Sequence, residues 1–439
     1  MGRWPVIACP HCARLHERLP VRAGAMASCS QCGHTLYRQS RLSLYSWIAL
    51  VLTALVIFCV ANYFPIVSLS AQGLTIQATL VGALTLTWQQ GHAFLAIMTG
   101  LFSFVFPLGQ ILFLLWALMA LVTRRIPWDF HYGLRVLRVI TSWSMVPVFQ
   151  LGLLVAIVKL ADMAVISTGP GLWAFAALTV VMTALGRVSA TRIWRHAEDA
   201  GLVPVSGALL RDGDTPVDCL ECGYVQPVIP RALRQSCARC SAPLHLRKPN
   251  DEGRAWAFVI AAGLLYIPAN VLPVMYVRLP TGVTSHTILG GVVELWRLGS
   301  WDLSIIVFIA SVVVPMTKLF VLAALLVRRP HWRGVSIQRQ RTRLYEMVEF
   351  VGQWSMLDVF VVILLSSMGN FPGISQITAG AGAVSFGVVV VLTMFAAMSY
   401  DPRRGWDRLP LHGGSMMSGS GTLSALGGNP TREVHKENA

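Results

Sequence analysis

Eight of the nine cysteines occur in four Cys-x-x-Cys pairs, and these pairs form two groups along the chain. In the first group CPHC is followed after sixteen residues by CSQC, and in the second CLEC is followed after fourteen residues by CARC. Two such pairs at this spacing can place four thiolates around one zinc ion, with each sulfur about 2.3 Å from the metal. The sequence therefore predicts two zinc ions, one bound by Cys9, Cys12, Cys29 and Cys32 and the other by Cys219, Cys222, Cys237 and Cys240.

Each predicted zinc ion has four protein ligands and no open position, which indicates a structural rather than a catalytic metal. A module of this size cannot bury much of a core, so the metal would hold it folded. A redox switch is the alternative, because a Cys-x-x-Cys pair can cycle between thiol and disulfide. Structural disulfides are not expected, because they do not persist in a reducing compartment. Three histidines near the first cluster, His11, His16 and His34, could replace a cysteine ligand, but we interpret them as surface residues. The ninth cysteine, Cys59, is interpreted as a packing residue inside a helix.

A single lysine, Lys318, stands inside the apolar run from residue 304 to 329. The basic end of this run begins ten residues later, which places Lys318 about 15 Å deep in a hydrocarbon core of about 30 Å. Asp358 lies about 13.5 Å into the next predicted helix, at nearly the same depth. An unpaired charge at this depth costs about 2.5–3.5 kcal/mol, so we hypothesise that the two residues pair or share a polar cavity.

The corresponding positions of the first half carry Gln110 and Pro147, so the charges are not repeated there. Lys159 and Asp162 lie near the end of another predicted span, from which they can reach the interface. The second half is therefore predicted to carry the polar site, and the first is chiefly a scaffold. The residues of the candidate polar path are Lys318, Asp358, Lys159, Asp162 and Gln110. The alternative interpretation of Lys318 and Asp358 is a buried ion pair that holds the bundle together and takes no part in transport.

Composition places these residues in a membrane protein. Of the 439 residues, 55% are hydrophobic and 13% are charged, and the mean hydropathy is +0.61. Soluble domains carry about 25% charged residues, so the chain is expected to cross a membrane several times. The net charge of +15 comes largely from arginines beside apolar runs, a pattern typical of cytoplasmic loops. We expect no nucleic-acid binding.

The chain repeats its own plan. ANYFPIVSL from Ala61 returns as ANVLPVMYV from Ala269, 208 residues later, and Pro107 returns as Pro315 at the same offset. SWSMVPVFQLGLL from Ser142 returns as QWSMLDVFVVILL from Gln353, 211 residues later. Three coincident landmarks predict a tandem repeat with one topology in both halves.

The predicted fold is mainly α, a polytopic membrane protein of two repeats, each with a zinc-ribbon-like module and a four-helix bundle. We expect a first module at 1–41, a first transmembrane domain at 42–195, a second module at 196–250, a second transmembrane domain at 251–407 and a disordered tail at 408–439. The eight predicted spans are about 43–63, 93–122, 142–162, 172–190, 255–275, 303–327, 349–369 and 381–399.

Arginine counts predict the orientation. Segments 123–141 and 328–343 contain four and six Lys or Arg residues, whereas 63–92 and 369–380 contain none. The basic segments should face the cytoplasm, which places both cysteine modules and both chain ends there. No phosphate-binding loop, metalloprotease motif or nucleophile elbow is present, so we expect no ATPase and no enzyme of those classes.

These features resemble the paraquat-inducible protein A family of bacterial inner-membrane proteins. The resemblance rests on the two cysteine modules, the repeated phrases above, IVKLADMAVISTGPGLWAF from Ile157 and SYDPR from Ser399. The first half departs from it, with RVSATRIW where the second half has SYDPRRGW. The resemblance implies phospholipid movement between inner and outer membranes, with a periplasmic tunnel protein of mammalian-cell-entry domains as partner.

The resemblance and the charges together predict a component of an intermembrane lipid transport system, with proton coupling through Lys318 and Asp358 as a hypothesis. Three alternatives remain. A membrane sensor or assembly factor would use the cysteine modules to bind proteins, a small-solute transporter would carry no phospholipid, and a membrane enzyme would need a motif of another class.

Overall fold

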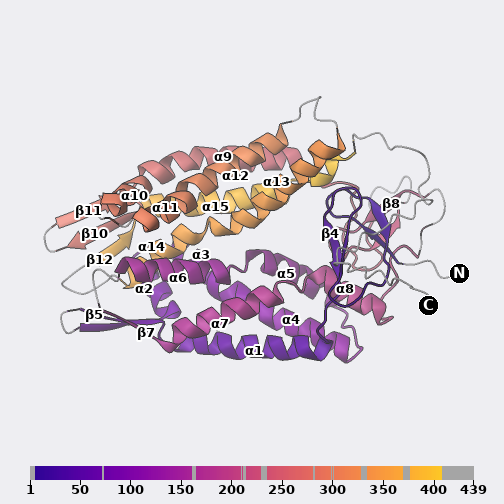
Figure 1. Ribbon diagram of the computed structural model, residues 1–439, viewed down its shortest axis with the longest axis horizontal. Coiled ribbons are helices and arrows are strands. Elements are labelled where there is room, and N and C mark those ends of the chain that lie inside the picture. Colours follow the sequence, from indigo (N-terminus) through magenta and orange to yellow (C-terminus); the bar gives the residue numbers. More distant parts are fainter. Residues whose placement is uncertain are drawn as a thin grey trace, which may run out of the picture.

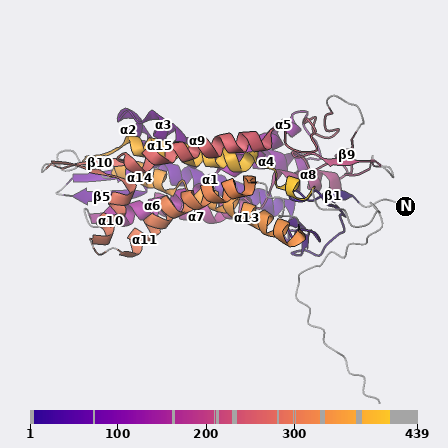
Figure 2. The ribbon, with the colours of Figure 1, turned by 90° about the horizontal axis from the view of Figure 1, so that it is seen from above.

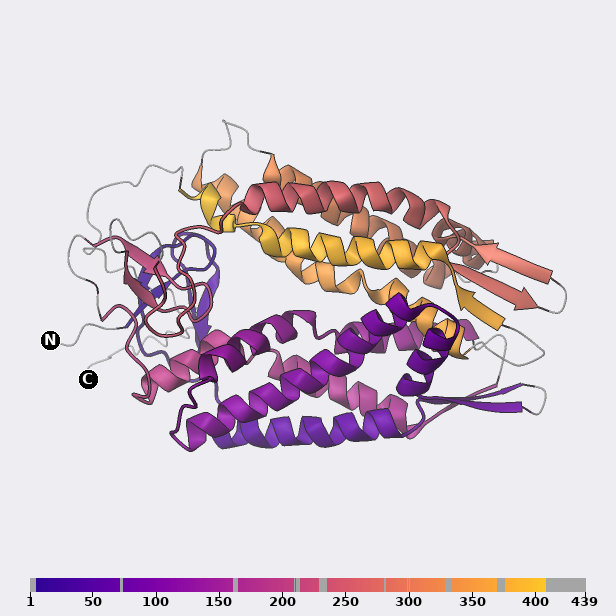
Figure 3. The ribbon, with the colours of Figure 1, turned by 180° about the vertical axis from the view of Figure 1, so that it is seen from behind.

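The computed structural model describes residues 5–71, 74–160, 165–208, 210, 214–228, 235–279, 282–297, 299, 301–327, 334–368 and 376–407. The predicted tail at 408–439 lies outside these residues. Two helical bundles lie side by side along the long axis. The first half lies below the second in Figure 1 and also in the view from behind in Figure 3. Both cysteine modules lie at one end and β-hairpins at the other, as Figure 2 also shows.

The first half follows one order of elements. It consists of α1 (Leu44–Tyr63), β5 (Val67–Ala71), β6 (Leu74–Ala78), α2 (Leu80–Gln89), α3 (Ala93–Gly100), the π-helical η1 (Leu101–Val105), α4 (Phe106–Val122), α5 (Phe130–Trp143), α6 (Val146–Leu160), β7 (Val165–Thr168), α7 (Pro170–Leu185) and α8 (Ala190–Asp199).

The second half repeats this order. It consists of α9 (Asp251–Val271), β10 (Met275–Leu279), β11 (Gly282–His286), α10 (Ile288–Arg297), α11 (Trp301–Phe308), the π-helical η2 (Ile309–Val313), α12 (Val314–Leu326), α13 (Val335–Trp354), α14 (Leu357–Met368), β12 (Gln376–Ala379), α15 (Ala381–Ser399) and the 3-10 helix η3 (Pro402–Gly405). The predictions of a mainly helical fold and of a tandem repeat are confirmed.

The cysteine modules are built from short antiparallel strands. The first contains β1 (Val6–Ala8), β2 (Leu15–Glu17), β3 (Met26–Ser28) and β4 (Thr35–Arg38), and the second contains β8 (Pro216–Asp218) and β9 (Val225–Pro227). Strand β1 pairs with β2, β3 with β4, and β8 with β9.

The count of eight spans is not reproduced among the described residues. Six helical segments there are long and apolar enough to cross a membrane: Leu44–Tyr63, Ala93–Val122, Phe130–Val158, Asp251–Val271, Ser304–Leu326 and Ala381–Ser399. A seventh would require α7 and α8 to form one span, although they are bent by 51°. The predicted span 349–369 is divided between the end of α13 and the short α14, because the helix breaks at Ser355 and Met356.

Both halves interrupt their helices at matching places. A π-helical segment lies directly before the helix that carries Pro107 or Pro315 near its start. Proline has no N–H and clashes with the carbonyl four residues earlier, and a π-helical turn accommodates this mismatch inside a continuous span. The repeated Trp-Ser-Met sequences mark a second interruption, where α5 gives way to α6 and α13 to α14. The repeated prolines and Trp-Ser-Met phrases are therefore sites of helix distortion.

A small sheet at the hairpin end of each half was not predicted. Strand β5 lies between β6 and β7 in one sheet, and β10 lies between β11 and β12 in the other, with antiparallel pairing throughout. The third strand comes from about 100 residues further along the chain in both sheets. Each sheet thus ties the segment after the first helix of a half, α1 or α9, to the segment before its last apolar helix, α7 or α15.

Glycines allow this closure. Gly171 donates its N–H to Pro65 O at 3.1 Å, and Gly382 donates to Pro273 O at 2.9 Å. A Cβ atom at Gly382 would lie 2.5 Å from Leu272 O, and one at Gly171 would lie 2.6 Å from the matching carbonyl of the first half. Only glycine lets the start of the last helix approach the Pro-containing turn so closely. The turn closed by this contact is the one in which the repeated phrases ANYFP and ANVLP end.

Helices from the two halves also pack on each other. Helix α14 packs on α6, where the rings of Phe149 and Phe360 meet edge to face with centroids 5.6 Å apart. At the hairpin end the Ser366 hydroxyl donates to Gln90 Oε1 at 2.8 Å. One buried hydrophobic cluster runs through both halves and includes Leu153 and Leu364. The bundles therefore share a core.

We expect the substitution Gly382→Ala to destabilise the protein by about 1–3 kcal/mol, because the new methyl group would collide with a backbone carbonyl. The melting temperature of the purified protein measures this. Gly263→Ala inside α9 is the matched control, since no atom lies within 4 Å of its added Cβ and alanine favours a helix. Equal melting of Gly382→Ala and wild type would contradict the closure described above.

Candidate metal centres and polar site

The first cysteine cluster brings its four sulfur atoms within 4.8 Å of one another. Cys9 Sγ lies 3.5 Å from Cys32 Sγ, and Cys12 Sγ lies 3.5 Å from Cys29 Sγ. All four side chains are buried, and none forms a disulfide. Four sulfurs about 2.3 Å from a central zinc would be about 3.8 Å apart, so the arrangement fits a tetrahedral metal.

The second cluster has the same geometry. Cys219 Sγ lies 3.6 Å from Cys240 Sγ, and Cys222 Sγ lies 3.6 Å from Cys237 Sγ, with all four side chains buried. The backbone N–H of Arg239 donates to Cys237 Sγ at 3.4 Å, which favours a thiolate at that position. Both clusters can bind a metal ion.

Each Cys-x-x-Cys pair is followed by a residue with a left-handed backbone. These residues are Ala13, Gly33, Gly223 and Ser241, with φ values of 61°, 82°, 71° and 55°. Each donates its N–H to the carbonyl of the first cysteine of its pair at 2.9 Å. The tight turn holds both thiols of a pair on one side. At Ala13 and Ser241 the left-handed backbone is sterically unfavourable, because these residues carry a side chain.

Lys318 is buried on α12, with 2% of its surface exposed. Its Nζ has no hydrogen-bond partner among the described residues. The ammonium group packs against α13, since a Cβ at Gly352 would lie 3.1 Å from Nζ. Ser355 at the following helix break is also buried, and its hydroxyl has no partner within the described part of the chain. The end of a helix leaves carbonyls without helical partners, which makes this break a favourable place for a cation.

The other predicted polar residues are placed only in part. The structure describes the backbone but not the side chain of Lys159 in α6 and of Asp358 in α14, and Asp162 lies outside the described residues. The pairing of Lys318 with Asp358 therefore stays a prediction. Asp358 is the second residue of α14, where a helix N-terminus stabilises a carboxylate. Gln110 is buried in α4, at 4% exposure.

The first cysteine module packs on the second half of the chain. Arg339 on α13 donates through Nε to Gln31 O at 2.6 Å, within the second Cys-x-x-Cys pair. Trp406, which follows η3, packs in one hydrophobic cluster with the four cysteines of this module. Its ring N–H donates to Thr342 on α13 at 3.3 Å.

The second module packs on the first half in the same manner. Arg138 on α5 lies 3.6 Å from Glu221 and donates to Leu220 O. On α8, Glu198 forms a buried ion pair with Arg239 of the module at 2.7 Å. Trp194, also on α8, shares a hydrophobic cluster with the cysteines of this module. The two modules are thus crossed, each docked mainly on the bundle of the other repeat.

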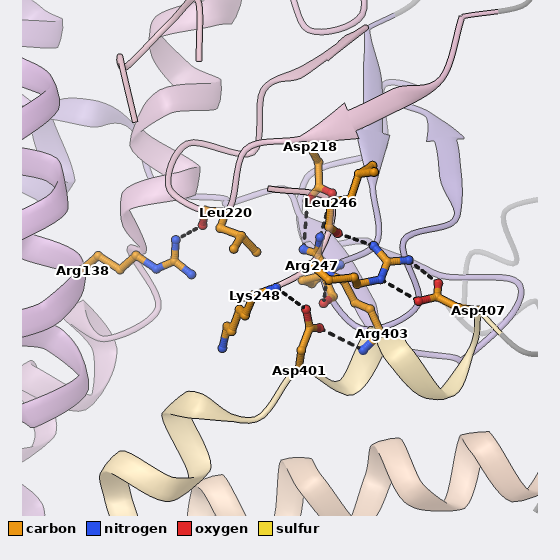
Figure 4. Close-up of polar contacts among 10 residues, drawn as sticks. Arg138, Asp218, Leu220, Leu246, Arg247, Lys248, Asp401, Arg403 and Asp407 are labelled. Carbon is orange, nitrogen blue, oxygen red and sulfur yellow. Dashed lines mark hydrogen bonds and ion pairs between the residues drawn. The ribbon is translucent and has the colours of Figure 1, made fainter. Parts of the chain in front are cut away.

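Arg403 in η3 joins the two modules (Figure 4). Its guanidinium donates two hydrogen bonds to Asp218, at 2.7 and 2.9 Å, and a third from Nε to Pro10 O at 2.9 Å. Asp401 accepts from the backbone N–H of Arg403 and, through its other oxygen, from that of Lys248, each at 3.1 Å. The guanidinium is thereby held between a carbonyl of the first module and a carboxylate of the second.

Burial also shifts two pKa values in this region. Burial lowers the pKa of His11 to about 3, and His34 and Arg403 act in the same direction. His11 is therefore neutral at physiological pH. Burial likewise lowers the pKa of Lys248, although Asp401 opposes the shift. A cavity of about 580 Å³ lies among these groups and is lined by both modules and parts of α5, α8 and α13.

Comparison with known proteins decides the family. The model of the family described as "Paraquat-inducible protein A" matches residues 44–198 and 253–410, one segment in each half. The chain belongs to the paraquat-inducible protein A family. It is 32% identical over 413 residues to the intermembrane transport protein PqiA of Escherichia coli (strain K12), covering 92% of this chain and 96% of that protein. No solved structure matches the chain.

Two further relatives belong to the same comparison. The lipophilic envelope-spanning tunnel protein A of Escherichia coli (strain K12) is 31% identical over 406 residues, covering 91% of this chain and 90% of that protein. A probable intermembrane transport protein of Haemophilus influenzae is 27% identical over 409 residues, covering 91% and 95%. The resemblance to the paraquat-inducible protein A family is confirmed over nearly the whole chain.

The geometry corrects two interpretations. His11 is not a surface histidine, because only 9% of it is exposed. Cys59 is exposed on α1 and so is not a packing residue. The phrase RVSATRIW departs from SYDPRRGW, yet Trp194 and Trp406 end these phrases and pack on a cysteine module in each case. The docking role is retained while its polar partners differ.

The docking residues Arg403, Asp218 and Glu346 were missed from the sequence. Their partners lie more than 180 residues away along the chain, so no local pattern connects them. A signal was present in the cluster of charges in SYDPRRGW directly after the last span. The family resemblance drew attention to this phrase but not to its contacts.

We expect Arg403→Gln to lower the melting temperature strongly, since it leaves Asp218 buried without its cation, at a cost of about 3–5 kcal/mol. The double variant Arg403→Gln/Asp218→Asn should lose much less than the sum of the two single variants. Thermal unfolding of the purified variants gives the coupling. Arg247→Gln is the control, because its pair with Asp407 is more exposed and should contribute about 0–1 kcal/mol. Additive losses would contradict the bridge.

We expect Cys222→Ser to lower the metal content of the purified protein by about one ion per chain and to destabilise the second module. Elemental analysis measures the first effect, and the susceptibility of residues near 216–240 to protease measures the second. Cys59→Ser is the matched control, since this thiol lies outside both clusters. An unchanged metal content in Cys222→Ser would show that the cluster binds no metal.

Proposed function

We propose that the chain is an inner-membrane component of an intermembrane lipid transport system. It passes phospholipid to, or receives it from, a periplasmic tunnel protein that contains mammalian-cell-entry domains. The protein transports lipid and is not an enzyme. The cysteine modules are cytoplasmic, and each holds one structural zinc ion.

Family membership over nearly the whole chain is the observation that carries this proposal. The chain aligns with 96% of a protein named for intermembrane transport and with 90% of one named as a lipophilic envelope-spanning tunnel protein. Alignment of this extent includes both helical bundles, which the family model also matches one by one, so the tandem-bundle architecture is shared. A shared architecture supports a shared role in moving lipid across the envelope.

The orientation is supported from both ends of the molecule. The basic segment 123–141 and the described residues 334–343 lie toward the module end, and basic segments favour the cytoplasmic face. Four exposed tryptophans, Trp88, Trp173, Trp296 and Trp301, lie on helices at the hairpin end. Tryptophan is enriched at membrane interfaces, which suits a periplasmic interface at that end. The two small sheets would then face the tunnel protein.

Lys318 is the group that we assign to the transport path. An ammonium group that is 2% exposed within a span, with no hydrogen-bond partner among the described residues, is costly and is kept where it functions. It can pair with a lipid phosphate or carry a proton that drives transfer. The neighbouring helix break at Ser355 adds polar backbone groups at the same place.

The test places a photoreactive residue at Val321, one helical turn from Lys318, and identifies crosslinked molecules by mass spectrometry. We expect phospholipid adducts in the wild type and few in Lys318→Met. Lipid transfer by Lys318→Met should fall about tenfold or more, because the loss of a positioned charge–phosphate or proton contact costs more than about 1.4 kcal/mol. Phe320→Leu, which changes an exposed side chain of the same helix, should retain transfer.

Absence of phospholipid adducts in the folded wild type would contradict the transport path. Full transfer by Lys318→Met would remove Lys318 from it. A protein that carries no phospholipid but still assembles with periplasmic partners would instead favour a sensor or assembly factor.

A further inference from the structure

Three potential metal ligands outside the cysteine clusters meet where the first module docks on α13. They are His11 and His34 of the module and Glu346 of the helix. His34 Nδ1 lies 2.7 Å from Glu346 Oε1, and His11 Nε2 lies 3.8 Å from the same oxygen. One ligand atom from each of the three lies within 4.8 Å of the other two.

The chemistry of this set suits a divalent transition metal. Two imidazoles and a carboxylate form a common three-ligand set for zinc and related ions, which leaves a position for water. The imidazole rings lie with centroids 4.0 Å apart, close enough for one ion to bind both. His11 is 9% exposed, and its Nδ1 is buried without a hydrogen-bond partner within the described part of the chain. This Nδ1 is the ring nitrogen other than the Nε2 that faces Glu346, and a buried ring nitrogen without a partner indicates a missing ligand.

The matching interface of the second module lacks this set. Aligning the Cys-x-x-Cys pairs places Glu221 opposite His11 and Ala242 opposite His34, and aligning the Trp-Ser-Met phrases places Arg135 opposite Glu346. Arg135 donates to Cys240 O, and Glu221 pairs with Arg138, so that interface is closed by ordinary hydrogen bonds and an ion pair. Docking a module on a bundle therefore does not itself require two histidines and a glutamate.

An ion can reach the three residues. The side chains of His34 and Glu346 are 26% and 38% exposed. His11 and His34 also line the cavity of about 580 Å³ between the modules. Arg403 lines the same cavity, and its charge is neutralised by the bidentate pair with Asp218.

We propose that His11, His34 and Glu346 form a third metal site, which binds Zn²⁺ or a similar divalent transition metal and clamps the first cysteine module to α13. The site is separate from the two four-cysteine clusters. Its ligands come from segments more than 300 residues apart, so the metal links the start of the chain to the second bundle.

The experiment uses the full-length, untagged protein in detergent, loaded with excess Zn²⁺ and desalted, with metal per chain measured by elemental analysis. We expect about three ions per chain in the wild type and about two in His34→Ala and in Glu346→Gln. His245→Ala is the matched control, since His245 is an exposed histidine of the second module and belongs to no ligand cluster. It should keep about three ions.

A Co²⁺ titration gives a second readout. Cysteine-bound cobalt produces strong thiolate charge-transfer bands, whereas the third equivalent should add only weak bands and should vanish in Glu346→Gln. A wild type that binds two ions would overturn the proposal, as would three ions in either variant, since the third ion would then be adventitious. The readout does not depend on lipid transfer, so a negative result leaves the proposed function standing.

Discussion

A cysteine module of about 30 residues buries too little apolar surface to fold on its own, so its fold depends on the cluster of four cysteines at its centre, which can bind a metal ion. Because the docking is crossed, the helices on which each module packs also depend on that module being folded. Arg339 and Trp406 hold the first module on the second half, while Arg138 and Trp194 hold the second module on the first half. The module end of both bundles therefore depends on the two clusters of four cysteines.

The opposite end is held by the backbone. There Gly171 and Gly382 allow the start of a helix to approach a backbone carbonyl more closely than any larger residue would. Three short strands pair in a sheet at this end of each half. Between the two ends, each half has a π-helical segment and a break at Trp-Ser-Met. In the second half these interruptions lie on the helix that carries Lys318 and on the helix that contacts it, where the proposed path needs room for a lipid headgroup.

Much of this plan could be predicted from the sequence. Cysteine spacing gave the two clusters because their ligands are local, and hydropathy with the repeated phrases gave the tandem bundles. The span count failed at 172–190 and at 349–369, because hydropathy does not show that α7 ends at Leu185 or that the helix breaks at Ser355. The strands of the small sheets are short and pair over about 100 residues, and the contacts of Arg403 and Glu346 are longer still. Such contacts are set by how the two halves pack, which a single sequence does not display.

The crossed modules bear on how such a chain could arise. A protein with only one repeat has one module and one bundle, and it could form the interface seen here only by lending its module to a second copy. Duplication and fusion of such an exchanged dimer would give one chain with the present connectivity. After fusion, the two interfaces no longer had to be identical, and His34 in one against Ala242 in the other records that divergence.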